Sequence, residues 1–108
     1  HGQCGGIAAS LSRRFAGKAP GEGGFINSWI SMLDDARDNV VAHCGQGPQA
    51  ARALELETVR LSLRNLETFP FVKPHQDAGT LRLIGAYFAI ADGILHVLDE
   101  ETDEYRPA

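Results

Sequence analysis

The stretch LRLIGAYFAI, residues 81–90, decides the fold that this chain is expected to adopt. Successive side chains of a β-strand point to opposite faces of the sheet. Both alternating sets are apolar here, apart from Arg82. A strand of this kind needs cover above and below, and it needs a neighbour on its free edge.

The residues that follow this strand predict a hairpin. Ala91-Asp92-Gly93 offers an Asp-Gly turn, and residues 94–98 return as a second apolar strand. The acidic tail DEETDEYRP, residues 99–107, is expected to form an exposed, charged edge. Because a lone hairpin is marginal in water, we expect further strands from sequence outside this chain or from a second chain.

Three helices are expected before the strands. Apolar residues at intervals of three and four predict helices over residues 7–15, 25–43 and 49–68. Pro70 ends the third helix, because proline lacks an amide hydrogen and disfavours helix in the residue before it. The glycine-rich stretch GKAPGEGG, residues 17–24, is expected to be a loop between the first two helices.

Length and composition exclude several classes of protein. At 108 residues, the chain supplies one domain at most, with a modest core. The 14 acidic and 10 basic residues give a charge of −4 without a basic stretch, so nucleic acid is not an expected partner. No apolar run approaches the ~20 residues that span a bilayer, and nothing resembles a signal peptide. Two distant cysteines, Cys4 and Cys44, make no disulfide framework, which favours a reducing, cytoplasmic location.

The chain opens with HGQCGG, residues 1–6, in which His1 and Cys4 have the spacing of two metal ligands. Zinc takes imidazole nitrogen at ~2.0–2.1 Å and thiolate sulfur at ~2.3 Å, and a catalytic zinc keeps one position open beyond three protein ligands. If Gly5 and Gly6 start a helix, Cys4 lies at its amino end, where the helix dipole favours a thiolate. The glycines also keep side chains away from the metal. A turn that happens to contain both residues is the alternative interpretation.

Taken in order, HGQCGGI, the glycine-rich loop, FINSW, LELETVRLSLRNLETFPFV and AGTLRLIGAYFAIADGILHVLDEET resemble the carboxyl-terminal half of a β-class carbonic anhydrase. The resemblance runs from His1 to about Pro107. It implies an α/β fold, with a mostly parallel sheet flanked by helices. Residues 1–108 would be the carboxyl-terminal part of a single domain, supplying its later helices and its last hairpin.

This resemblance also implies a function. His1 and Cys4 match the second and third zinc ligands of the family, and Gly5 and Gly6 match active-site backbone. The reaction implied is reversible hydration of carbon dioxide to bicarbonate and a proton by zinc-bound hydroxide. The partners implied are carbon dioxide or bicarbonate and further copies of the protein, in a homodimer or a higher oligomer. Phe88 stands where some members carry the tyrosine of an allosteric bicarbonate pocket, which argues against such a pocket.

The family's first zinc ligand is a cysteine in an upstream Cys-x-Asp/Ser-x-Arg motif, which works with an Asp-Arg pair. This sequence contains neither, so it offers no catalytic residue beyond the two metal ligands. These 108 residues alone are therefore expected to bind zinc weakly and to show no substantial turnover. Two alternatives stay open: a non-catalytic relative that acts as an interaction module, and a small zinc module closed by Cys44.

Other chemically interesting residues have plainer interpretations. His43 and Cys44 are adjacent and are expected to form a helix end with a partly buried cysteine. His75, expected in a loop, and His96, expected in the final strand, are interpreted as surface or packing residues. The remaining candidates are interpreted as solvated charges or as core: Arg13, Arg14, Asp34, Asp35, Arg37, Asp38 and Trp29.

Overall fold

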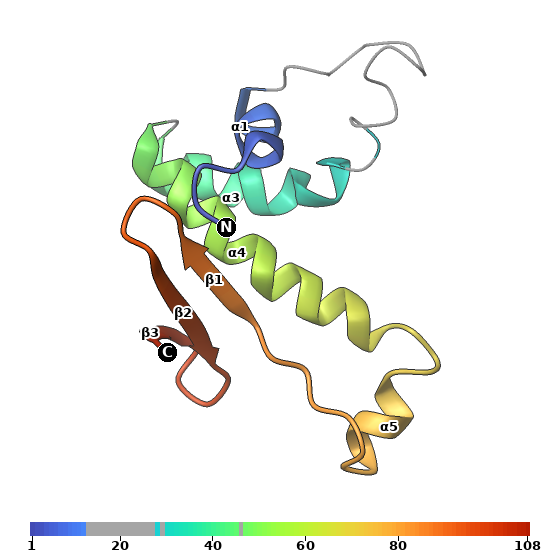
Figure 1. Cartoon of the computed structure of the whole chain (residues 1–108). Helices are drawn as coiled ribbons and strands as arrows, with labels where there is room; N and C mark the ends of the chain where they lie inside the picture. Colours follow the sequence, from blue (N-terminus) through green and yellow to red (C-terminus); the bar gives the residue numbers. More distant parts are fainter. Residues whose placement is uncertain (13–27, 29, 46) are drawn as a thin grey trace. The chain divides into compact units, whose positions relative to one another are not determined.

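The computed structural model describes residues 1–12, 28, 30–45 and 47–108 (Figure 1). In chain order, its main elements are α1 (Gly5–Ser12), η1 (Ser31–Leu33), α3 (Asp34–Cys44), α4 (Pro48–Glu67), α5 (Lys73–Asp77), β1 (Ala86–Ala89), β2 (Ile94–Asp99) and β3 (Glu104–Pro107). They form two compact units, which we call the helical unit (Gln3–Glu55) and the sheet unit (His1–Gly2 with Leu56–Ala108). Each unit is described by itself.

The sheet unit contains an antiparallel sheet with the order β1-β2-β3. The expected hairpin is confirmed: Tyr87 pairs with His96, and Gly93 closes the loop by donating its amide to the Ala89 carbonyl at 2.8 Å. Gly93 has a φ of 70°, a conformation that glycine adopts without steric cost. The Asp-Gly signal in the sequence therefore marks a real turn.

The strand expected over residues 81–90 is wrong in length, because β1 covers only Ala86–Ala89. Its partner β2 supplies the reason. The last bond toward the start of β1 runs from the Leu98 amide to the Gly85 carbonyl, at 2.9 Å. At Asp99 the chain turns toward β3, so residues 81–84 have no strand partner among the described residues.

The acidic tail is mostly exposed, as expected, but it also forms a third strand that the sequence did not predict. The turn before β3 is held by the Asp99 carboxylate, which accepts hydrogen bonds from the amides of Glu101 at 2.9 Å and Thr102 at 3.4 Å. These bonds are the main cause that lowers the pKa of Asp99. Acidic residues are depleted in strands, so the acidic sequence of this segment did not predict β3.

One face of β1 is packed within the sheet unit. A side chain added at Gly85 would place its Cβ 2.9 Å from both Leu63 and Val59 of α4, so the strand approaches this helix closely. Tyr87 is only 2% exposed on the same face, whereas Phe88 on the opposite face is 45% exposed. Cover on the second face, which the doubly apolar pattern predicts, stays a prediction.

The helical unit joins α1, α3 and the first part of α4. Helix α1 contacts α3 and buries Ile7, Ala9 and Leu11. The second expected helix is described as η1 and α3, and its aspartates are exposed as expected. Arg37, expected on the solvated face, is instead buried, and its charge is compensated by ion pairs with Asp34 and Asp38 at 3.0 and 3.1 Å.

Several expectations fall outside the described residues: Arg13, Arg14, the end of the first helix to residue 15, the loop over 17–24, and the second helix at Phe25 and Trp29. The third helix is confirmed, since α4 departs from the expected 49–68 by one residue at each end. No helix in the described part of the chain has the length and apolar character needed to cross a membrane.

Three smaller expectations are wrong. His75 lies in the short helix α5 rather than in a loop, because a proline in the first turn of a helix is tolerated, and Pro74 occupies that place. Cys44 is exposed rather than partly buried. His96 lies in β2, the middle strand, because the tail adds β3 beyond it.

The contact at Gly85 predicts that Gly85→Ala destabilises the protein. The added methyl group would overpack the junction of β1 and α4, at a cost of about 1–3 kcal/mol in the free energy of unfolding. Chemical denaturation measures this cost, with Gly5→Ala as the matched control because open space surrounds that position. Equal stability of the two variants would contradict the close packing.

Candidate functional site

The segment that carries His1 is attached to the outer edge of β1. The Gly2 amide donates to the Phe88 carbonyl at 2.8 Å, which extends the sheet beyond its three strands. The His1 ring turns back on its own backbone, with Nδ1 2.8 Å from the Gly2 carbonyl oxygen. Because a carbonyl only accepts, Nδ1 carries the proton, and in the neutral ring Nε2 keeps the free lone pair.

Cys4 immediately precedes α1, which begins at Gly5, two residues before the expected start at Ile7. Its carbonyl accepts the amide of Ala8 at 3.1 Å, the first hydrogen bond of the helix, and its thiol is free and half-buried. Beyond its chain neighbours and the backbone of its own helix, no described atom lies within 4 Å of a Cβ built on Gly5. The cysteine therefore sits beside open backbone at the positive end of a helix dipole, which favours negative charge.

His1 Nε2 and Cys4 Sγ are donor types that zinc binds, so these two residues fit the metal that the sequence predicts. Among the described residues, no three His, Cys, Asp or Glu side chains come together as a metal site. His43 and His75 use Nδ1 for local contacts with Asn39 and Thr80, at 2.8 and 3.2 Å. The described residues thus contain no complete donor set, and His1 and Cys4 stay the two ligands that the sequence predicts.

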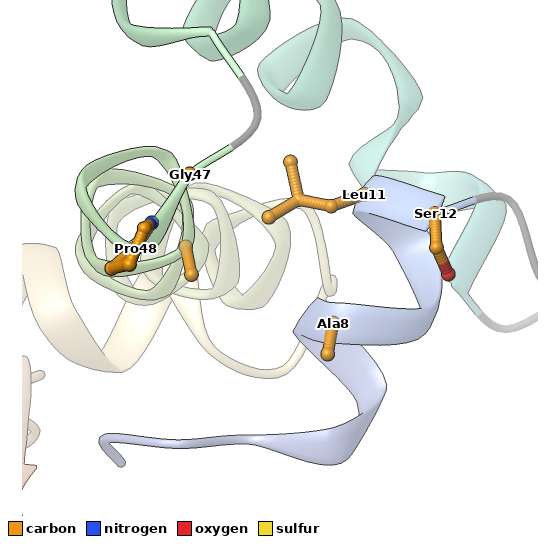
Figure 2. A pocket seen from close by; sticks show the side chains of 6 residues that line it. Ala8, Leu11, Ser12, Gly47 and Pro48 are labelled. Carbon is orange, nitrogen blue, oxygen red and sulfur yellow. The ribbon is translucent and has the colours of Figure 1, made fainter.

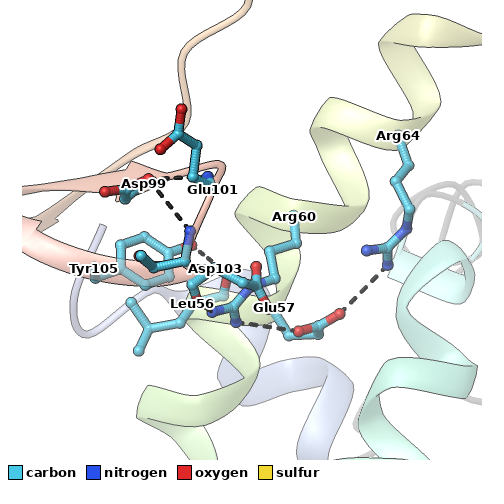
Figure 3. A network of polar contacts seen from close by, with 9 residues as sticks. Leu56, Glu57, Arg60, Arg64, Asp99, Glu101, Asp103 and Tyr105 are labelled. Atoms are coloured by element: carbon cyan, nitrogen blue, oxygen red, sulfur yellow. Dashed lines mark hydrogen bonds and ion pairs between the residues drawn. The ribbon is translucent and has the colours of Figure 1, made fainter.

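The polar network of the sheet unit joins α4 to β3 and the turn before it (Figure 3). Arg60 donates from Nε to the Asp103 carboxylate and from a terminal nitrogen to the Asp103 carbonyl, both at 2.8 Å. Glu57 accepts from Arg60 and Arg64 at 3.3 Å. The Tyr105 hydroxyl donates to the Leu56 carbonyl at 2.6 Å. Both arginines contact carboxylates here, so the network connects the strand and its turn to the helix.

The environment of the network shifts two pKa values. Burial raises the pKa of Tyr105, against the opposing effect of the Arg60 cation. Burial lowers the pKa of Arg60, but the hydrogen bond and charge of Asp103 outweigh it, so the net pKa is raised. No local sequence pattern indicates this network, because 43 residues separate Arg60 from Asp103.

The helical unit contains a hollow between α1 and the start of α4 (Figure 2). Its volume is about 340 Å³, and its lining residues are Ala8, Leu11, Ser12, Gly47, Pro48 and Ala51. None of these side chains is titratable, and only the Ser12 hydroxyl is polar. The hollow therefore supplies no acid, base or metal ligand of its own.

Comparisons with known proteins agree with one another. The family model described as "Carbonic anhydrase" matches residues 1–95. Carbonic anhydrase 1 of Escherichia coli O157:H7 is 28% identical over 108 residues, which cover 99% of this chain and 48% of that protein. The solved structure of the β-carbonic anhydrase CcaA matches with a TM-score of 0.86 at 21% identity, over 100% of this chain and 52% of that one. The chain thus spans about half the length of these proteins.

The network predicts that Tyr105→Phe destabilises the protein by about 1 kcal/mol, the net contribution of one hydrogen bond. The pH dependence should also change. Because the folded pKa of Tyr105 is raised, its contribution to stability is complete below the unfolded value of 10.0 and is lost as pH rises through the folded pKa. Urea denaturation of wild type and variant at neutral and alkaline pH measures both effects. An alkaline loss of equal size in the two proteins would contradict the assignment.

Proposed function

Because the chain belongs to the carbonic anhydrase family and has the fold of the β class, we propose that the protein catalyses the reversible hydration of carbon dioxide to bicarbonate and a proton. The observation that carries the proposal is the His1–Cys4 segment. It offers one imidazole nitrogen with a free lone pair and one free thiol at the start of a helix.

His1, through Nε2, and Cys4, through Sγ, would hold a zinc ion. When bound, zinc supplies a nucleophile at neutral pH, because it lowers the pKa of a coordinated water from 15.7 to about 7. The Nδ1–H bond to the Gly2 carbonyl fixes the tautomer and the orientation of the His1 ring, as outer hydrogen bonds do for most metal-binding histidines. The amino end of α1 favours the negative charge of a thiolate ligand at Cys4.

The rest of the site would come from residues outside this chain. The family resemblance implies a further cysteine ligand and an Asp-Arg pair, which the sequence lacks. The family also supports a homodimer or a larger assembly. Exposed apolar residues on and beside β1, including Ile84 at 62% and Phe88 at 45%, are suited to contact with such additional structure. The free cysteines favour a reducing, cytoplasmic location.

In the full-length protein, we expect Cys4→Ser to remove zinc and to lower carbon dioxide hydration by more than about 100-fold, because loss of a ligand exceeds the 10–100-fold cost of losing an outer hydrogen bond. The matched control is Cys44→Ser, at an exposed position at the end of α3. Stopped-flow hydration assays and elemental analysis measure activity and zinc.

Full zinc content and activity in Cys4→Ser would contradict the assignment of the ligand. A full-length wild-type protein that binds zinc but hydrates no carbon dioxide would favour the alternative, a non-catalytic module of the same fold.

A further inference from the structure

Gly2 packs tightly against β1. It is buried, and its amide donates to the Phe88 carbonyl at 2.8 Å. A Cβ added at this position would lie 2.9 Å from the Tyr87 hydroxyl oxygen and 3.3 Å from the Ile90 amide nitrogen. The first distance is shorter than real side-chain contacts allow, and the second atom is backbone. This position therefore accepts glycine and excludes any larger residue unless Tyr87 moves.

Tyr87 has little freedom to move. Its exposure is 2%, and its ring packs beside that of His96 with centroids 6.3 Å apart. The face of β1 that carries it is also held close to α4, as the contacts around Gly85 show. In a close-packed interior, a side chain enclosed in this way yields only at the cost of its neighbours' packing. The hydroxyl of Tyr87 is therefore held in place next to Gly2.

The position of Gly2 in turn determines that of His1. The two residues are joined by a peptide bond, and the Gly2 carbonyl accepts the Nδ1–H of the His1 ring at 2.8 Å. Thus one hydrogen bond ties Gly2 to the sheet, and a second ties the imidazole to Gly2. Displacing Gly2 by the size of a methyl group would move both the backbone and the ring acceptor of His1.

We infer that Tyr87 is a positioning residue that acts through Gly2. Its hydroxyl and the adjoining β1 backbone leave room only for glycine at position 2, and this packing orients the His1 imidazole for metal binding. This inference rests on the proposed function, in which His1 is a zinc ligand. It assigns to Tyr87 a role that the sequence interpretation did not, because only the fold brings residue 87 against residue 2.

The test compares Co²⁺ affinity and the Co²⁺ absorption spectrum of the purified full-length protein with those of Gly2→Ala, Tyr87→Phe and the double variant. Gly2→Ala should weaken affinity by about 10–100-fold and alter the spectrum, as expected when an outer contact of a metal ligand is lost. Tyr87→Phe removes the oxygen that the new methyl group meets. The double variant should therefore regain most of the affinity, well beyond the roughly twofold error of additivity.

Gly47→Ala is the matched control, because it adds a methyl group in open space, and its affinity and spectrum should equal those of wild type. Unchanged affinity in Gly2→Ala would overturn the inference, and so would a double variant as weak as the product of the two single effects. A wild-type protein that binds no Co²⁺ would instead contradict the proposed function, and with it the premise of this inference.

A measurement on the metal-free wild type keeps the test decisive if Gly2→Ala does not fold. At a pH where the His1 ring is neutral, imidazole ¹⁵N shifts should report the Nδ1–H tautomer, and the Tyr87 ring should give nuclear Overhauser contacts to the Gly2 α-protons. The Nε2–H tautomer, or the absence of those contacts, would overturn the inference.

Discussion

The hydrogen bond from the Gly2 amide to the Phe88 carbonyl links the proposed zinc ligand His1 to the sheet. It uses the outer edge of β1, which no described strand occupies. The backbone of the His-x-x-Cys segment therefore begins as an extension of the sheet. The proposed ligand His1, attached in this way, inherits the rigidity of the strand, which is how precise sites are usually built.

This hydrogen bond can position the backbone of His1 only as firmly as β1 itself is held. At one end, Gly85 allows the strand to approach Leu63 and Val59 of α4. Across the sheet, Arg60 joins α4 to the turn at Asp103. The same helix therefore supports the sheet through an apolar contact near β1 and a charged contact next to β3. These contacts are far from His1 in sequence, yet they support the strand on which its backbone rests.

The sequence predicted the local features well and the long-range ones poorly. The turn at Gly93 and the helix start after Cys4 depend on neighbouring residues, so their signals are readable in the chain. The length of β1 depends on where β2 ends, and β3 depends on pairing with β2 despite its acidic residues. The contact of Tyr87 with Gly2 joins residues at opposite ends of the chain. No local pattern encodes such a contact, so it is visible only in the structure.

The identity of the atoms around the metal tests the central claim most directly. X-ray absorption at the zinc edge of the purified full-length protein should show a mixed first shell, with nitrogen at about 2.0–2.1 Å and sulfur at about 2.3 Å. That result would agree with an imidazole and thiolate contribution from His1 and Cys4. A shell of oxygen alone or of sulfur alone, or a protein that retains no zinc, would contradict the account.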